Sequence, residues 1–185
     1  KQIKDPQLPI TVATADQIET FSPPIFAAYC SKNGKMCCER LARHKRIIAP
    51  MCYEITEVKD TFKLVIDASR DELDIPQFLV ESEMVFVLHI IRAATKEDII
   101  PMEIRMTNPP EADNFSQYAK CPVVKAEENA ILFHTKDMEK PFISYNEAMW
   151  EFFEPELQRR LYEMEKDDSF SAKVRSALTE LLPGG

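Results

Sequence analysis

The sequence predicts an α+β fold: a small mixed or antiparallel sheet with packed helices and a C-terminal helical pair. Short segments that alternate apolar and polar residues predict strands, and longer segments with apolar residues at helical spacing predict helices. The two kinds of segment are interspersed along the 185 residues. Because the predicted strands sit mostly in hairpins, this pattern favours an α+β fold over a doubly wound parallel sheet.

The N-terminal part is predicted to begin irregularly and to continue as two helices. Residues 1–20 mix polar and small residues with two prolines and indicate no regular element. Residues 22–49 have a helical pattern, with Ser22 as the N-cap and a proline in the first turn. We expect Gly34 to separate two helices and Pro50 to end the second.

Period-two alternation predicts a hairpin over residues 51–68, with Lys59 and Asp60 at its turn. Three further short strands are predicted at residues 101–107, 121–125 and 130–135. A short helix is predicted between them, over residues 111–119.

The helix predicted over residues 76–95 is the most apolar segment of the chain. Its run from Met84 to Ile91 contains one polar residue, His89. A helix that is apolar on all sides is buried on most of them. We therefore expect this helix to be the central element, packed on the sheet.

The predicted helical pair consists of residues 145–166 and 169–182, and Pro155 either kinks the first helix or begins a new one. An apolar stripe on the first helix follows the α+β unit and carries large side chains. Such stripes more often belong to a core, but these two features favour partial exposure and a dimer contact. The stripe residues are Met149, Phe153, Leu157 and Leu161.

The charge balance is unfavourable for direct binding to nucleic acid. The net charge is −8, and affinity for polyanions comes mainly from lysine and arginine. The one basic cluster lies within residues 40–46. The chain has three glycines, two of them at its end, which excludes a phosphate cradle built from clustered glycines.

The five cysteines lack the spacing of a disulfide framework and indicate a reduced, cytoplasmic setting. No segment resembles a signal peptide, and no apolar run reaches the roughly 18 residues of a membrane span.

Motifs for catalysis and metal binding were not found, so we expect no enzyme activity, no cofactor and no metal. The chain has no G-x-S-x-G, C-x-x-C or H-E-x-x-H sequence. Neighbouring carboxylates such as Glu81 and Glu83 are interpreted as solvated surface. A gathered set of thiolates remains an alternative, from Cys30, Cys37, Cys38 and Cys52.

One stripe on the central helix holds the most informative polar residues. Steps of four and three residues place on one face Phe78, Ser82, Val85, His89 and Arg92. A buried imidazole needs a hydrogen-bond partner, either a protein group or a polar group of a ligand. The arginine could pair with a ligand carboxylate or with an acidic residue of the protein.

We hypothesise that a mostly apolar pocket between the central helix and the sheet binds a small molecule. His89 and Arg92 would bind its polar groups, and Tyr29, Tyr53 and Phe78 would form the walls. The cavity is expected beside His89, with a volume of about 300 Å³ or more.

The order of segments resembles the N-terminal effector-binding, arabinose-binding-like domain of AraC-type transcription regulators. Four segments carry much of the resemblance: residues 38–48 (CERLARHKRII), 100–110 (IPMEIRMTNPP), 118–123 (YAKCPV) and 129–133 (NAILF). The end of the chain, residues 174–184 (VRSALTELLPG), is similar to the helix that precedes the helix-turn-helix units in these regulators.

The resemblance implies a sensing and dimerisation domain of a bacterial, cytoplasmic regulator that binds an unknown small-molecule effector as a homodimer. DNA would be bound only through a C-terminal domain that is absent here. We expect an effector-binding domain over residues 1–144, a helical dimerisation and linker segment over 145–182, and the start of a linker at 183–185. The first residue is not Met, which suggests a piece of a longer chain.

Two other functions remain open at this point. One is a cysteine-based redox or metal sensor, and the other is a constitutive dimerisation module without an effector.

Overall fold

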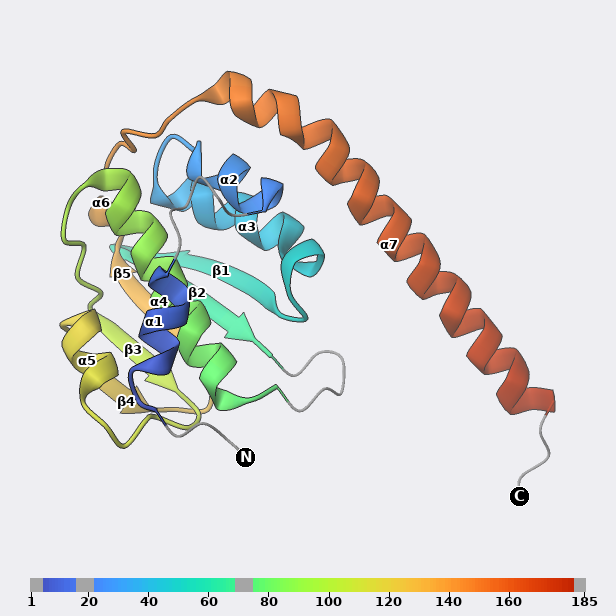
Figure 1. Ribbon diagram of the computed structural model, residues 1–185, viewed down its shortest axis with the longest axis horizontal. Helices are drawn as coiled ribbons and strands as arrows, with labels where there is room; N and C mark the ends of the chain where they lie inside the picture. Colours follow the sequence, from blue (N-terminus) through green and yellow to red (C-terminus); the bar gives the residue numbers. More distant parts are fainter. Residues whose placement is uncertain (1–4, 16–21, 69–74, 182–185) are drawn as a thin grey trace.

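The computed structural model describes residues 5–15, 22–68 and 75–181, and the side chains of the last helix up to residue 167. Five strands form one mixed sheet in the order β1-β2-β5-β3-β4. The strands are β1 (Cys52–Val58), β2 (Thr61–Asp67), β3 (Glu103–Met106), β4 (Val123–Lys125) and β5 (Ala130–His134). The α+β prediction with a small mixed sheet is confirmed (Figure 1).

Helices α1 to α4 surround the candidate site, α5 and α6 are short connections, and α7 is the C-terminal helix. Their bounds are α1 (Leu8–Thr14), α2 (Pro23–Tyr29), α3 (Gly34–Ile48), α4 (Gln77–Thr95), α5 (Asn114–Ala119), α6 (Thr135–Met138) and α7 (Glu147–Leu181). Figure 1 shows α4 crossing the sheet with α1 lying over it, and these two helices pack together.

The buried face of the sheet and helix α4 form the core, as the sequence predicts. Phe62, Leu64 and Ile66 alternate along β2 and are at most 1% exposed. Every residue of α4 from Met84 to Leu88 is buried. These side chains belong to one continuous hydrophobic cluster that also includes residues of α1, α2 and α3.

The expectation that the strands sit mostly in hairpins is wrong. Strands β1 and β2 form the predicted hairpin, but β3 lies between β4 and β5 and pairs with both. The side chain of Asn129, just before β5, accepts a hydrogen bond at 3.0 Å from the amide of Thr107, just after β3. This contact joins the adjacent ends of the two strands. Inserting β3 satisfies its backbone groups on both sides.

Two short helices were not predicted. Helix α1 lies in the segment expected to be irregular, and α6 follows β5 directly. A helix as short as α1 is marginal alone in water, so packing decides whether it forms. Ile10 and Ala13 supply that packing, since both are buried in the core cluster.

The predicted C-terminal pair is instead one continuous helix, α7, which runs through Pro155 and through residues 167–169. Pro155 is exposed, so water can reach the carbonyl that a proline leaves without its helical partner. At 1.5 Å per residue, a helix of 35 residues is about 52 Å long. Figure 1 shows α7 leaving the body and projecting away from it.

Residues 183–185, expected to begin a linker, lie outside the described residues. Among the described residues, none of the helices has the length and apolar character that crossing a membrane requires.

Helix α3 begins at a tight contact with α6. The side chain of Asn33 accepts a hydrogen bond from the Met36 amide at 3.0 Å and so caps the helix. A Cβ atom on Gly34 would lie 3.0 Å from Met138 Cε, so glycine permits the close approach of the two helices. The predicted break at Gly34 is confirmed, whereas Ser22 occupies the N-cap of α2 without a side-chain hydrogen bond.

We predict that Asn33→Ala lowers the free energy of unfolding by about 1 kcal/mol, because an amide at the start of α3 loses its acceptor. Asn33→Asp keeps an acceptor and should retain most of the stability. Urea denaturation of both variants checks this, and equal losses would contradict the capping role.

Candidate functional site

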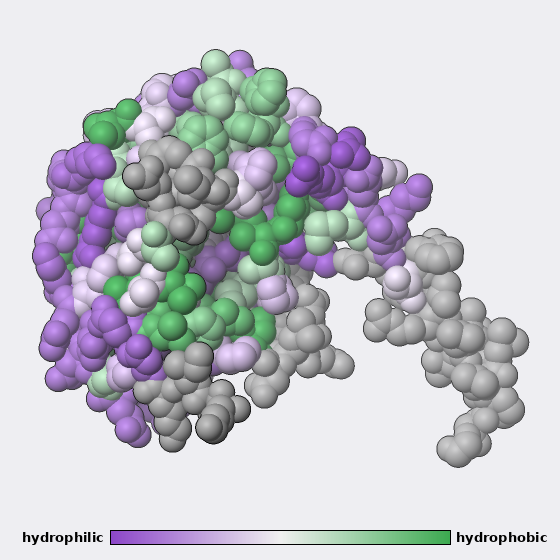
Figure 2. Space-filling model, viewed as in Figure 1, coloured by the Kyte–Doolittle hydropathy of each residue, from purple (hydrophilic) through white to green (hydrophobic). Residues whose placement is uncertain are grey.

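An apolar pocket of about 220 Å³ opens between α1, the start of α2, the end of α3 and α4. Its walls combine side chains from segments far apart in the sequence: Val12, Ala13, Ile25, Ile48, Ala49, Pro50, Met51, Leu79 and Phe86. Lys45, Ser82 and Glu83 add the polar groups. Figure 2 shows hydrophobic residues gathered on this side of the molecule, over α1, α4 and the neighbouring helix ends.

A buried ion pair joins α3 to α4 at this pocket. The ammonium of Lys45 lies 2.5 Å from Oε1 of Glu83. The hydroxyl of Tyr53, on β1, donates a hydrogen bond to the same oxygen. The Lys45 side chain is 2% exposed and that of Glu83 is 13% exposed. Burial of two charges is tolerated when they pair and additional hydrogen bonds satisfy them, which is the arrangement here.

Aromatic rings complete the surroundings of the Lys45 ammonium. It lies 5.0 Å from the ring centre of Tyr53 and 6.0 Å from that of Phe86. Burial raises the pKa of Tyr53 well above its ordinary value, and the neighbouring carboxylate of Glu83 adds to this. The phenol therefore keeps its proton and acts as a donor.

The second carboxylate oxygen of Glu83 has no hydrogen-bond partner among the described residues. The hydroxyl of Ser82, also at the pocket, donates to the carbonyl of Phe78 at 2.8 Å. The pocket therefore combines apolar walls with hydrogen-bond acceptors that the protein leaves available, a composition typical of small-molecule sites.

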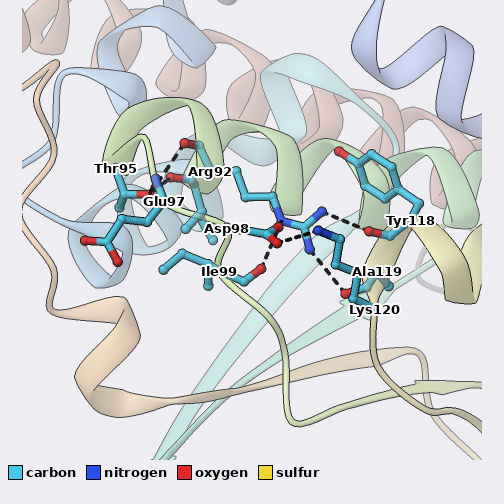
Figure 3. A network of polar contacts seen from close by, with 9 residues as sticks. Arg92, Thr95, Glu97, Asp98, Ile99, Tyr118, Ala119 and Lys120 are labelled. Carbon is cyan, nitrogen blue, oxygen red and sulfur yellow. Dashed lines mark hydrogen bonds and ion pairs between the residues drawn. The ribbon is translucent and has the colours of Figure 1, made fainter.

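Arg92, predicted to bind a ligand, instead holds three segments of the protein together (Figure 3). Its guanidinium donates to the backbone carbonyls of Ile99, Tyr118 and Ala119 at 2.9, 3.0 and 3.2 Å. Asp98 lies 3.5 Å from its Nε. These contacts occupy the fork of donors, so the structure favours the protein-pairing alternative for Arg92.

The other predicted ligand residues are dispersed. His89 is half-buried on α4, and burial lowers its pKa, helped by Arg92 and Lys96. Tyr29 is buried and Phe78 half-buried, and neither belongs to the lining of the apolar pocket. Tyr53 does not line the pocket, but its hydroxyl donates a hydrogen bond to Glu83, which does.

Lys45 and Glu83 are not among the predicted site residues. The interpretation of Glu83 as solvated surface is wrong, because its side chain is 13% exposed and paired with Lys45. A signal was present: Glu83 directly precedes the most apolar stretch of α4, where an ionised side chain must find a partner. The partner is 38 residues away and follows only from the fold.

Helix α3 also contacts α7, through what we call the α3–α7 junction: Arg40, His44, Glu147 and Trp150. Arg40 donates to both carboxylate oxygens of Glu147 at 2.8 and 3.0 Å. Its guanidinium carbon lies 3.9 Å from the ring centre of Trp150. His44 is 1% exposed, its ring centre is 5.8 Å from that of Trp150, and its Nε2 has no partner among the described residues.

The predicted dimer stripe divides into two parts. Leu157 is 1% exposed and packs with Trp150 and Ala27, and the Phe153 ring lies 6.1 Å from that of Phe26. These two residues attach α7 to α2 within the chain. Met149 and Leu161 are half-buried, and large exposed side chains on α7 are Phe152 and Tyr162.

Three of the four candidate thiolates, Cys30, Cys37 and Cys38, are buried and poorly placed for thiol chemistry. Burial raises the pKa of Cys37 well above its ordinary value and that of Cys38 to about 12, and it raises the pKa of Cys30 as well. Thiols with raised pKa values are weak nucleophiles and weak metal ligands at neutral pH. The described residues contain no group of three or more histidine, cysteine or acidic side chains placed to hold a metal.

A second pocket, of about 440 Å³, lies beside the ends of β2 and β5, and its polar side chains are mainly carboxylates. Glu128 there is paired with Lys63 at 2.6 Å and with Arg105 at 3.5 Å. The apolar pocket is the better candidate because its walls are mostly hydrocarbon around one charged pair, as is usual for small-molecule sites, whereas Glu54 and Glu127 in the larger pocket are exposed to water.

The comparisons with known proteins agree with this architecture. The family model described as the arabinose-binding domain of AraC transcription regulator, N-terminal, matches residues 1–142. The solved structure of the transcriptional regulator CdpR from Pseudomonas aeruginosa is similar in fold, with a TM-score of 0.63 at 13% sequence identity. The match covers 80% of this chain and 50% of that chain. Comparison with curated proteins gives no significant match.

We predict that Lys45→Met lowers the free energy of unfolding by about 3 kcal/mol or more, because it leaves the Glu83 carboxylate buried without its cation. The double variant Lys45→Met/Glu83→Gln should lose less than the sum of the single losses. Denaturant titration measures this cycle, and additive losses would contradict the coupling. Arg159→Ala, which breaks exposed ion pairs with Glu156 and Glu163, serves as a control that should change the stability little.

We predict that the chain loses stability as the pH falls below the ordinary histidine pKa of 6.5, in part because of His44. Burial lowers the pKa of His44, although its contact with the Arg40 carbonyl opposes the shift. The unfolded chain therefore binds the proton first, so the stabilisation is present above pH 6.5 and is lost on acidification.

Unfolding free energies at about pH 7.5 and about pH 5.5 test this. His44→Gln should reduce the difference between the two values. An unchanged difference would assign the pH dependence to other groups, among them His89.

Proposed function

Because the chain belongs to the family of N-terminal arabinose-binding domains of AraC transcription regulators, we propose that it senses a small-molecule effector for a regulator of this kind. The observation that carries the proposal is the apolar pocket closed on one side by the Lys45–Glu83 pair. A constitutive dimerisation module would have no use for such a pocket, and the buried thiols disfavour a redox sensor.

We infer that α3 transmits the state of the pocket to α7. Lys45 and Ile48 of α3 line the pocket, and Arg40 and His44 of the same helix contact α7. An effector shifts an existing equilibrium by no more than its difference in affinity for the two states. A displacement of α3 would change the contact of Arg40 Nη2 with both carboxylate oxygens of Glu147 in the first turn of α7.

DNA binding would come from helix-turn-helix units outside this chain, as the net charge of −8 suggests. We infer that the regulator acts in the bacterial cytoplasm. We also infer that it forms a homodimer through the part of α7 that projects from the body.

The single tryptophan of the chain provides the test, because Trp150 lies in the α3–α7 junction. We predict that compounds which bind the pocket change the fluorescence of Trp150. Arg40→Ala should abolish that change while leaving binding intact, as followed by the methyl signal of Met51 in the pocket. Compounds that shift Met51 in the unaltered chain without affecting Trp150 would contradict transmission through α3.

The dimer contact has its own test by sedimentation velocity. We predict that Leu161→Asp and Tyr162→Asp shift the chain from dimer to monomer, because both place a charge on the projecting part of α7. Phe153→Asp is less informative, since this ring packs on Phe26 within the chain. Ala148→Asp, at an exposed position in the first turn of α7, is the matched control. An unchanged association state in both test variants would remove the dimer contact from α7.

A further inference from the structure

We infer that the apolar pocket takes a compact apolar primary amine, whose ammonium group binds the unpartnered carboxylate oxygen of Glu83. This inference rests on the proposed sensing function and adds the chemical class of the effector. Three features of the pocket support the ligand class: its size, its apolar walls and the hydrogen-bond acceptor that Glu83 offers.

The size restricts the ligand to a small molecule. The pocket volume of about 220 Å³ lies below the range of about 300–1,000 Å³ usual for drug-sized ligands. A single ring or a short branched chain suits this volume better than a fused ring system or a sugar phosphate.

The walls require an apolar body. Ile25 of α2, Ile48 and Met51 around the end of α3, and Leu79 and Phe86 of α4 supply aliphatic and aromatic surface. A polyhydroxylated ligand would leave several of its hydroxyl groups facing hydrocarbon without partners, which costs free energy for each one.

The polar group that remains available is an acceptor. Lys45 is 2% exposed at its side chain, donates to Oε1 of Glu83 and lies near the rings of Tyr53 and Phe86, so a ligand has little access to its donors. Tyr53 donates to that same oxygen. Oε2 of Glu83 is without a partner among the described residues, and Glu83 lines the pocket. The ligand must therefore bring a donor.

Charge favours an ammonium over other donors. A hydrogen bond between an ammonium and a carboxylate is about twice as strong as one between neutral groups. A ligand carboxylate would face the Glu83 carboxylate, while the Lys45 ammonium, at 2% exposure, offers it little accessible surface. At short range like charges repel strongly where little water enters. The net charge of −8 also attracts cations toward the protein.

Three probes of matched shape test the inference: cyclohexylamine, cyclohexanol and cyclohexanecarboxylate. Each is titrated into the full chain, and binding is followed by the methyl signals of Met51, Ile25 and Ile48. We expect the amine to bind at least about tenfold more tightly than the alcohol or the carboxylate.

Glu83→Gln should remove most of this preference, whereas Glu81→Gln should keep it. Glu81 lies two residues earlier on α4, is half-buried and is not part of the pocket lining. If Glu83→Gln fails to fold, Lys45→Met/Glu83→Gln removes both charges together. Ala49→Phe keeps the ion pair and should block all three probes by filling the pocket.

Preferred binding of the alcohol or the carboxylate would overturn the ligand class and leave the sensing function standing. Equal amine binding by the Glu83 variants would overturn the role of Glu83. If none of the probes shifts the pocket methyl signals, the assignment of a compact amine is wrong. Failure of the sensing function is recognised separately, when no compound of any class alters the fluorescence of Trp150.

Discussion

The Lys45–Glu83 ion pair is the interaction on which the arrangement of the functional region depends. It fastens α3 to α4 and, through the hydroxyl of Tyr53, both helices to β1. A buried pair of this kind contributes little net stability compared with an apolar replacement, but losing one partner is costly. The constraint fixes the relative position of three elements and also places a carboxylate at the edge of an otherwise apolar pocket.

Helix α3 contacts two other helices, α4 on one face and α7 on another. Toward α4 it presents Lys45, and toward α7 it presents Arg40, whose guanidinium binds the carboxylate of Glu147 and lies over the ring of Trp150. The Arg40 contact is directional, because Nη2 reaches both oxygens of Glu147, Nη1 donates to Ser31, and the guanidinium lies over an aromatic ring. A rigid helix held in this way can relay a displacement from one face to the other.

Helix α7 is built differently from the rest of the chain. Near its start, Trp150 and Leu157 pack on α2 and form a small hydrophobic cluster separate from the main core. Farther along, the side chains up to residue 167 are exposed or half-buried, and Figure 1 shows the helix alone in space. Because most helical stability in proteins comes from tertiary packing, this projecting part is where the proposed dimer contact would lie.

The sequence by itself determined the fold class, the central position of α4, the hairpin of β1 and β2, and the break at Gly34, because each follows from periodicity or a local backbone preference. It also carried the family resemblance. The tertiary structure alone decided the insertion of β3 between β4 and β5, the formation of α1, the continuity of α7 through Pro155, and the role of Arg92 as a backbone clamp. The pairing of Lys45 with Glu83 was likewise decided by the tertiary structure. A charged side chain needs a partner only where folding removes it from water, and the local sequence does not indicate which residue that partner is.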